Sequence, residues 1–576
     1  GDREGHELLE GAALAAGETP SPEMVAAAGE EGTLAAGPAW ALFGGVVALL
    51  AAILLISALA RDVGVAPPEK SQDSLMDRAR EVAVRLGWTA PPADSSGVFV
   101  RDYPYLTWMA ENAPPGWARH LASSWWTSAL FRYRQSPRPL FLHNARGSVR
   151  ADDPPMNVSG MLTVELDTRG RLRKLLAVPR QVRGGPTTVS PPPWAELFAE
   201  AGLDAREFVP SEAKWLPPVP YDALAGWTGT VPGMPTATLS VVAAFQSGRP
   251  AYFELIAPWS EAAQETTRPT AIRATVTDVV AGVLGVCFTV AGLLFARRNL
   301  RLGRGDRTGA LRLSAAGFLL VLVSHLFARH FSAAPGAFER AFWETLANAL
   351  PPAVFLAVVY LALEPYFRRR YPELLVSWTR LLSGRIRDPL VGRDHLQGIL
   401  AGLAVCLVLS LENVPPALFS ARGQTPMGVD PVALAGLPGL ASYAAFAIAE
   451  SLVWLFFTAA SLFLGRLFLR NAALAAAATW LVLFQKGSGG ENPLIEMTGA
   501  AVIATILLAV FLRGGLLGLA VAFGVFNLLR SAPITPEVSR WFAGYGLACL
   551  AAVLAAAAYA LWAARGGAVF AVPVDE

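Results

Sequence analysis

The apolar positions of the chain gather into ten long runs that polar segments separate. The first run covers 38–60 and is followed directly by Arg61 and Asp62. About 20 apolar residues in a helix cross the ~30 Å hydrocarbon core of a bilayer. Nine more runs fill the C-terminal half: 272–296, 310–330, 341–364, 396–413, 436–464, 468–485, 494–512, 514–530 and 541–563. We therefore predict a mainly α-helical membrane protein with about ten transmembrane helices. The tight turn between 494–512 and 514–530 leaves open that these two runs form a re-entrant pair.

A long polar block between the first and second runs carries a different pattern. We expect a helix at Ser74–Leu86 and, later, a β-hairpin at 160–179. A second helix is expected at Trp194–Ala201 and a second hairpin at 236–259. Alternating apolar and polar residues around a glycine-containing turn are typical of hairpins. Because the same order occurs twice, we predict an α+β region built from two similar helix–hairpin modules, whose many aromatic residues fill small cores or line a ligand groove.

These patterns divide the chain into five parts. They are a cytoplasmic linker (1–37), transmembrane helix 1 (38–61), an extracytoplasmic α+β region (62–270), a nine-helix membrane domain (271–565) and a cytoplasmic tail (566–576). The orientation follows from arginines, which concentrate in alternate loops and mark the cytoplasmic side of a membrane protein. Both termini are therefore expected in the cytoplasm.

Composition supports this class and excludes others. Hydrophobic residues make up 53% of the chain and charged residues only 16%, whereas soluble domains carry about 25% charge. The formal net charge of +2 gives no basic field for nucleic acid. All three cysteines lie in apolar stretches, without a metal-type spacing. We predict no metal, no cofactor and no nucleic-acid partner for this chain.

One acidic residue is predicted in the middle of a membrane helix. Charged groups in hydrocarbon are costly and usually face a partner or a functional site. Glu450 stands within the apolar run 436–464, and His325 and Arg329 share a face of another helix because they are four residues apart. Glu450 could pair with either of them, as a structural pair or as a proton or ligand site.

The basic loop at 366–395 is the most sharply patterned cytoplasmic segment. Apolar residues at helical spacing next to arginines favour an amphipathic helix at 371–382 that lies on the inner leaflet. The alternative is a contact surface for another cytoplasmic domain. The candidate interface residues are Trp378, Arg380, Arg385, Arg387, Asp388, Arg393 and Asp394.

Four stretches resemble the C-terminal half of large bacterial membrane-bound serine/threonine protein kinases of acidobacterial type. They are ALAAGETPSPEMVAAAGEEG in the linker, VRLGWTAPPADSSG (84–97), FRYRQSPRPL (131–140) and LLSGRIRDPLVGRD (381–394). The order of linker, membrane helix, extracytoplasmic region and multi-helix domain also agrees with that family. The resemblance implies a kinase domain upstream of Gly1, which would use ATP and Mg²⁺. The chain itself has no glycine-rich loop, HRD, DFG or APE motif of a kinase.

The resemblance implies a sensing and anchoring role in the bacterial inner membrane. The expected partners are the lipid bilayer, the chain's own kinase domain and an unknown extracytoplasmic ligand, and a homodimer is compatible with the family. Two other classes stay open. One is a polytopic transporter or permease that uses Glu450, and the other is an intramembrane enzyme, for which no pair of catalytic groups stands out.

Overall fold

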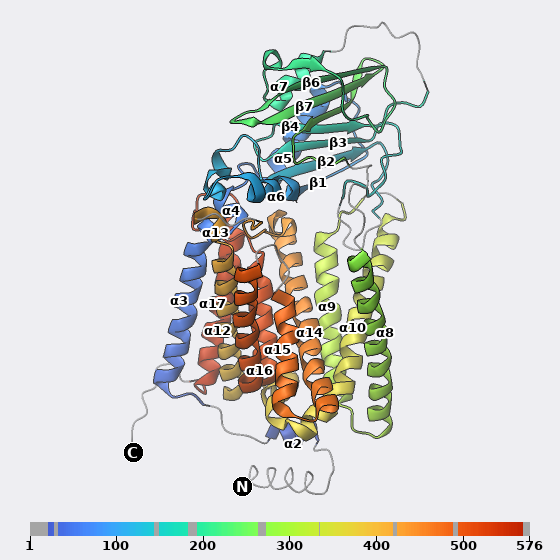
Figure 1. Cartoon of the computed structure of the whole chain (residues 1–576). Helices are drawn as coiled ribbons and strands as arrows, with labels where there is room; N and C mark the ends of the chain where they lie inside the picture. The colour runs from blue at the N-terminus through green and yellow to red at the C-terminus, as the bar shows by residue number, and fades with distance from the viewer. Residues whose placement is uncertain are drawn as a thin grey trace.

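The structure is a computed structural model, and it describes residues 21–27, 33–142, 149–182, 193–262, 272–332, 335–418, 423–487 and 493–567. These residues form a helical bundle with an antiparallel sheet region at one end (Figure 1). The helix α2 lies at the opposite end of the bundle from the sheet (Figure 1). The chain therefore has one end of the bundle that carries the sheet and one end that carries the linker.

Long apolar helices make up the bundle. They are α3 (Ala36–Ala60), α8 (Ile272–Arg301), α9 (Arg307–Ala328), α10 (Ala337–Arg370), α12 (Pro389–Glu412), α14 (Gly436–Leu469), α15 (Ala472–Gly487), α16 (Pro493–Arg530) and α17 (Ala543–Ala564). Seven helices in the described part of the chain are long and apolar enough to cross a membrane. This confirms a helical membrane-type architecture, and the count of ten spans stays a prediction. The helix α16 contains two of the predicted runs, and α8 and α15 are not among the seven.

The helix α16 reverses direction inside its own range. Gly515 has φ 63° and ψ −157°, a conformation that belongs almost only to glycine. Its backbone lies against Leu374 at the linker end of the bundle. The start and end of α16 both lie at the sheet end, where Gly499 is beside Glu412 and the Arg530 carbonyl contacts Arg61. The two runs thus form a helical hairpin whose limbs both extend between the two ends of the bundle.

Glycines let α12 pack closely against the second limb of this hairpin. A Cβ at Gly398 would lie 2.5 Å from the Gly518 carbonyl oxygen, and one at Gly402 would lie 2.6 Å from that of Ala522. These positions are one helical turn apart, so they form a flat stripe on α12. In membrane helices, such small residues permit the backbone approach that replaces hydrophobic association.

The sheet region has eight antiparallel strands in the order β1-β2-β3-β4-β8-β7-β6-β5. The first half contains α5 (Gln72–Arg85), β1 (Asp94–Arg101), α6 (Tyr103–Asn112), β2 (Ala129–Ser136), β3 (Leu162–Asp167) and β4 (Leu172–Ala177). The second half contains α7 (Trp194–Ala201), β5 (Val209–Ser211), β6 (Ala223–Val231), β7 (Met234–Gln246) and β8 (Arg249–Ile256). Each half begins with a helix and has four strands, and β4 pairs with β8 where the halves meet.

The predicted helices and hairpins occur as α5, β3–β4, α7 and β7–β8. The other four strands were not predicted, because their alternation is broken. β2, for example, buries Arg134, Gln135 and Ser136 in succession. Several of the aromatic residues fill the core as predicted: Trp117 and Trp126 are buried, and Trp126 packs edge-on against Trp259 at 5.0 Å.

Short helices connect the two regions and close the linker end. They are α2 (Pro22–Ala27), α4 (Asp62–Val65), α11 (Val376–Leu382) and α13 (Pro415–Leu418). The helix α4 follows α3 directly and leads into the sheet region, so the first membrane helix is continuous with the sheet at a single residue, Arg61.

Candidate functional site

The end of α3 is fixed to the bundle by a buried arginine. Arg61 has no exposed surface, and its guanidinium donates hydrogen bonds to the carbonyl oxygens of Leu529 (2.7 Å), Arg530 (3.1 Å) and Ala532 (2.8 Å). Leu529 and Arg530 end the second limb of α16 and Ala532 follows it, at the helix end where carbonyls lack their usual helical donors and the helix dipole is negative. The side chain therefore acts as a charged cap that joins the first membrane helix to the last turn of α16.

The next residue joins the same point to the sheet. Asp62 accepts hydrogen bonds from the backbone N–H groups of Val63 (2.6 Å) and Val429 (3.3 Å). Its carboxylate also lies 3.6 Å from the guanidinium of Arg101, which ends β1. Arg101 in turn donates to the carbonyl oxygen of Pro426. Burial raises the pKa of Asp62, and Arg101 opposes this shift.

The loop before α14 completes this arrangement, which we call the junction (Arg61, Asp62, Arg101 and the segment 424–434). Met427 pairs with the end of α3, since its N–H donates to the Ala60 carbonyl (2.7 Å) and its own carbonyl accepts from the Asp62 N–H (3.0 Å). Trp541, which precedes α17, stacks on Phe99 of β1 at 6.0 Å and donates to the carbonyl of Pro68 (3.0 Å). The junction therefore connects α3, α16, the loop before α14 and the sheet.

A second contact joins the sheet to the segment that directly follows α9. The Nε2 atom of His330 lies 2.8 Å from an oxygen of Asp94, the first residue of β1. The other oxygen of Asp94 accepts from the N–H of Leu140 (2.9 Å). The sheet thus touches the bundle through both ends of β1, at Arg101 and at Asp94.

The predicted pairing of Glu450 with His325 or Arg329 is wrong. Glu450 pairs with Arg530 at 3.0 Å and accepts a hydrogen bond from the Trp454 indole (3.2 Å). Arg329 instead pairs with Glu344 of α10. The reason is the hairpin of α16, which brings Arg530 back to α14. The pairing of Arg329 follows from the position of α10, which lies against α9.

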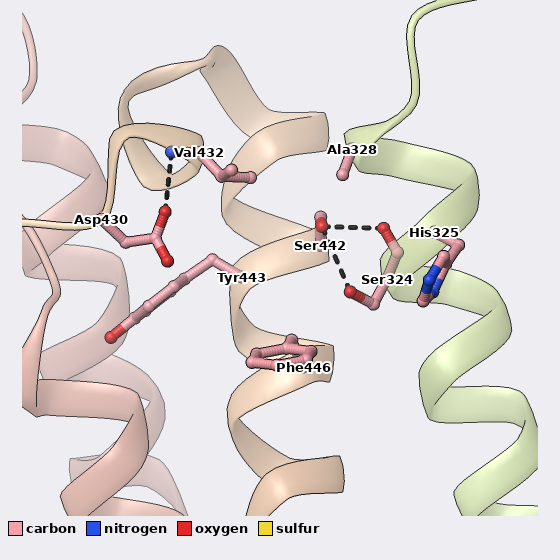
Figure 2. Close-up of a pocket in the computed structure, with 8 residues that line it drawn as sticks. All are labelled: Ser324, His325, Ala328, Asp430, Val432, Ser442, Tyr443 and Phe446. Carbon is pink, nitrogen blue, oxygen red and sulfur yellow. Dashed lines mark hydrogen bonds between the residues drawn. The ribbon is translucent and has the colours of Figure 1, made fainter. Parts of the chain in front are cut away.

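His325 lines a small cavity between α9, α14 and the loop before α14 (Figure 2). Its Nδ1 atom lies 2.9 Å from the Val321 carbonyl oxygen, and the nearby Ser442 hydroxyl donates to the Ser324 carbonyl (2.8 Å). The Tyr443 side chain extends away from His325 and donates to the Leu528 carbonyl (2.8 Å). The cavity volume is about 50 Å³, which has room for a water molecule or two. Glu450 does not line it, so the predicted membrane site is not brought together.

The segment at 371–382 is enclosed, and its interpretation as a helix on the inner leaflet is wrong. Trp378, Arg380 and Asp394 are all buried. The helix α11 is covered by α2, whose Val25 is buried in the same apolar core as Trp378. A helix that lies on a bilayer would expose one face, whereas α11 has the bundle on one side and the linker on the other.

The remaining candidates of that segment hold its end or reach solvent. Asp388 accepts from Arg380 (3.0 Å) and caps α12 by accepting from the Leu390 N–H (3.0 Å). Arg393 pairs with Asp394 at 3.1 Å. The two remaining members of the predicted set are exposed, Arg385 and Arg387. A contact with another cytoplasmic domain stays a prediction, with these two arginines as its accessible part.

No family model, curated protein or solved structure matches this chain. Its function must therefore be argued from the residues. Within the described ranges, no group of three or more His, Cys, Asp or Glu side chains could hold a metal ion.

The sequence did not identify the junction as a site. Arg61 and Asp62 follow an apolar run, a place where charged residues usually mark the exit into water. Their partners Arg530, Val429 and Arg101 lie far away in sequence. A hint was the absence of any spacer between the apolar run and the charged pair.

Proposed function

We propose that this chain is the membrane-anchoring and signal-sensing portion of a bacterial receptor-type serine/threonine protein kinase. Phosphoryl transfer, with its ATP and Mg²⁺, would reside in an N-terminal domain outside these 576 residues. The resemblance in the linker and in three other stretches supports the kinase part of the proposal. The chain would lie in the plasma membrane with the sheet region outside and the arginine-rich loops in the cytoplasm.

The observation that carries the proposal is the position of α3. Its outer end is held at the junction by Arg61 and Asp62, which contact the bundle and the sheet together. Before its inner end, the N–H of Leu34 donates to the Ala564 carbonyl at the end of α17 (3.0 Å), and α2 packs on α11. A displacement of the sheet would therefore act on both the bundle and the segment that leads to Gly1. Such a link would transmit a signal only if the signal binds two arrangements unequally.

The test begins with the coding sequence upstream of Gly1. A kinase domain with its catalytic motifs is expected there, and its absence would end the proposal.

The full protein would then be placed in vesicles and its autophosphorylation measured with ATP and Mg²⁺. We expect Arg101→Gln to change the rate about 5-fold or more, the lower range of allosteric coupling. The control Arg206→Gln alters an exposed arginine of the same region that pairs with the nearby Asp204. If Arg101→Gln leaves the autophosphorylation rate unchanged, this chain anchors the kinase but does not regulate it.

A transport function predicts a different result, which the variant Glu450→Gln would show. A permease that uses Glu450 would lose uptake in Glu450→Gln, whereas a sensor would keep its signal response. The Arg530 partner already neutralises Glu450, and this supports a structural pair. Substrate uptake that depends on Glu450 would favour the transporter.

A further inference from the structure

A cavity of about 450 Å³ opens at one side of the sheet region. Its walls come from the loop after α5, from the ends of β2, β4 and β7, and from the starts of β3 and β8. Small-molecule sites in proteins typically measure about 300–1,000 Å³. We propose that this cavity binds a small organic anion that carries a carboxylate, a hydrogen-bond donor and an apolar group, at about the size of a tripeptide.

The cavity belongs to both halves of the sheet. Gln135 and Arg180 come from the first half, and Gln246 and Arg249 come from the second. They meet because β4 pairs with β8 in the middle of the sheet, so the neighbouring antiparallel strands begin and end at the same side. A ligand here would contact both halves at once.

The charge of the lining favours an anion. Arg180 and Arg249 both line the cavity and are exposed, and in the part of the chain that the structure describes neither forms an ion pair. Among the described residues that line the cavity there is no Asp or Glu. The planar guanidinium fork matches a carboxylate with two parallel hydrogen bonds. Two arginines without acidic partners therefore leave their charge for a ligand.

A buried acceptor calls for a donor on the ligand. The Oε1 atom of Gln246 is buried and has no hydrogen-bond partner in the described part of the chain. Leaving a buried polar atom unpaired costs about 1–3 kcal/mol. An N–H or O–H group on the ligand would satisfy this oxygen once the amide turns toward the cavity. Chloride or sulfate would not supply such a donor, and the apolar part of the wall favours an organic compound over hydrogen phosphate or bicarbonate.

The apolar part of the wall is stiff. Trp88 is held by a hydrogen bond from its indole N–H to the Pro250 carbonyl (3.1 Å). Prolines at 91, 92, 137 and 179 also line the cavity, and proline has a fixed φ. A preformed apolar wall reduces the entropy lost on binding, and it would hold the apolar group of the ligand.

The cavity is close to the contact between the sheet and α9. Ser136 lines the cavity and is paired in register with Asp94, whose carboxylate contacts His330. An occupant would therefore sit one strand pair away from a point where the sheet touches the bundle. The ligand's role as the signal rests on the proposed function, whereas its binding does not.

Binding is measured on the full chain in nanodiscs by calorimetry, without a kinase readout. The probes are the N-acetylated tripeptide Ala-Ala-Phe, N-acetylphenylalanine and phenyl phosphate, and the C-terminal amide of N-acetyl-Ala-Ala-Phe serves as the uncharged match. We expect the tripeptide acid to bind, and its amide to bind at least 10-fold more weakly. If phenyl phosphate binds more tightly than the tripeptide acid, the site selects a phosphate and not a carboxylate, and the proposed ligand class is overturned. No charge-dependent binding in the whole panel would overturn the site.

Variants locate the binding. Arg180→Gln with Arg249→Gln should weaken the tripeptide acid at least 10-fold and remove its preference over the amide. Gln246→Leu should weaken acid and amide alike, because it removes the acceptor and not the charge. The control Arg206→Gln should bind as the wild type does. Equal binding by the double variant and the wild type would contradict the site, while a kinase test could still succeed.

Discussion

At the scale of single residues, Arg61 is a buried cation whose counter-charge is the end of a helix. Its guanidinium contacts three carbonyl oxygens of one terminus, and the nearest carboxylate, Asp62, is turned toward Arg101 and the backbone. A planar fork can serve several carbonyls at once, whereas an ammonium is a point charge. The residue therefore fixes position by geometry as well as by charge.

We expect Arg61→Met to destabilise the protein by about 3 kcal/mol, because it removes three hydrogen bonds from a charged donor to buried carbonyl oxygens. Arg61→Lys should recover part of this loss. The measurement is the melting temperature of the full chain in detergent, followed by tryptophan fluorescence. The matched control is Arg540→Met, which removes a half-exposed arginine paired with Glu537. Equal melting temperatures for the wild type and Arg61→Met would show that the cap is not needed.

Asp102 provides a prediction on pH. Burial raises the pKa of this carboxyl from 3.8 to about 6, although it accepts hydrogen bonds from the Trp126 indole (2.9 Å) and the Tyr105 N–H (3.1 Å). The folded state then holds the proton more tightly than the unfolded state. Stability must therefore fall as the pH rises from about 4 to about 6, by up to about 3 kcal/mol from this group.

The expected readout is a melting temperature that decreases through this window in the wild type. Asp102→Asn should remove this component, because the amide does not titrate. Asp77→Asn, at an exposed carboxylate, should keep it. An unchanged slope in Asp102→Asn would assign the titration to another group.

At the scale of elements, the hairpin in α16 depends on one backbone conformation. A side chain at Gly515 would be strained by its positive φ, and its Cβ would lie 2.4 Å from the Leu374 carbonyl oxygen. A Cβ at the neighbouring Gly514 would lie no closer than 3.7 Å to the side chains around it. Alanine substitutions at these two adjacent glycines therefore distinguish the loss of the turn from the mere replacement of a glycine by alanine.

We expect Gly515→Ala to cost about 2–4 kcal/mol from strain and steric clash. Gly514→Ala should be neutral or slightly stabilising, since alanine has the higher helix propensity. The yield of folded protein after detergent extraction and its melting temperature would measure both. Similar values for the two variants would mean that α16 continues without a turn.

At the scale of the whole molecule, what could be predicted from the sequence was local. The apolar runs and the two glycine-turn hairpins are patterns within 30 residues, and α7 was predicted at its exact bounds. The pairing of Glu450 with Arg530 joins positions 80 residues apart, and it requires the reversal at Gly515. The burial of α11 likewise requires α2 on top of it. Contacts between residues far apart in sequence leave no trace in a local hydrophobic pattern. The junction and the cavity consist of such contacts, so only the structure identifies them.

The orientation of the whole chain gives the last prediction. If the sheet region is extracytoplasmic, a cysteine at the exposed Ser247, in the turn between β7 and β8, should react with a membrane-impermeant maleimide in intact spheroplasts. A cysteine at the exposed Ser383, after α11, should react only after permeabilisation. A Cys287→Ser background removes one native thiol, and Cys406 and Cys549 are buried and should stay silent. Labelling of Ser383→Cys in intact spheroplasts would place the arginine-rich loops outside and contradict the positive-inside rule for this chain. The linker and anything that precedes it would then lie outside as well, where ATP is absent, and the kinase proposal would fail together with the topology.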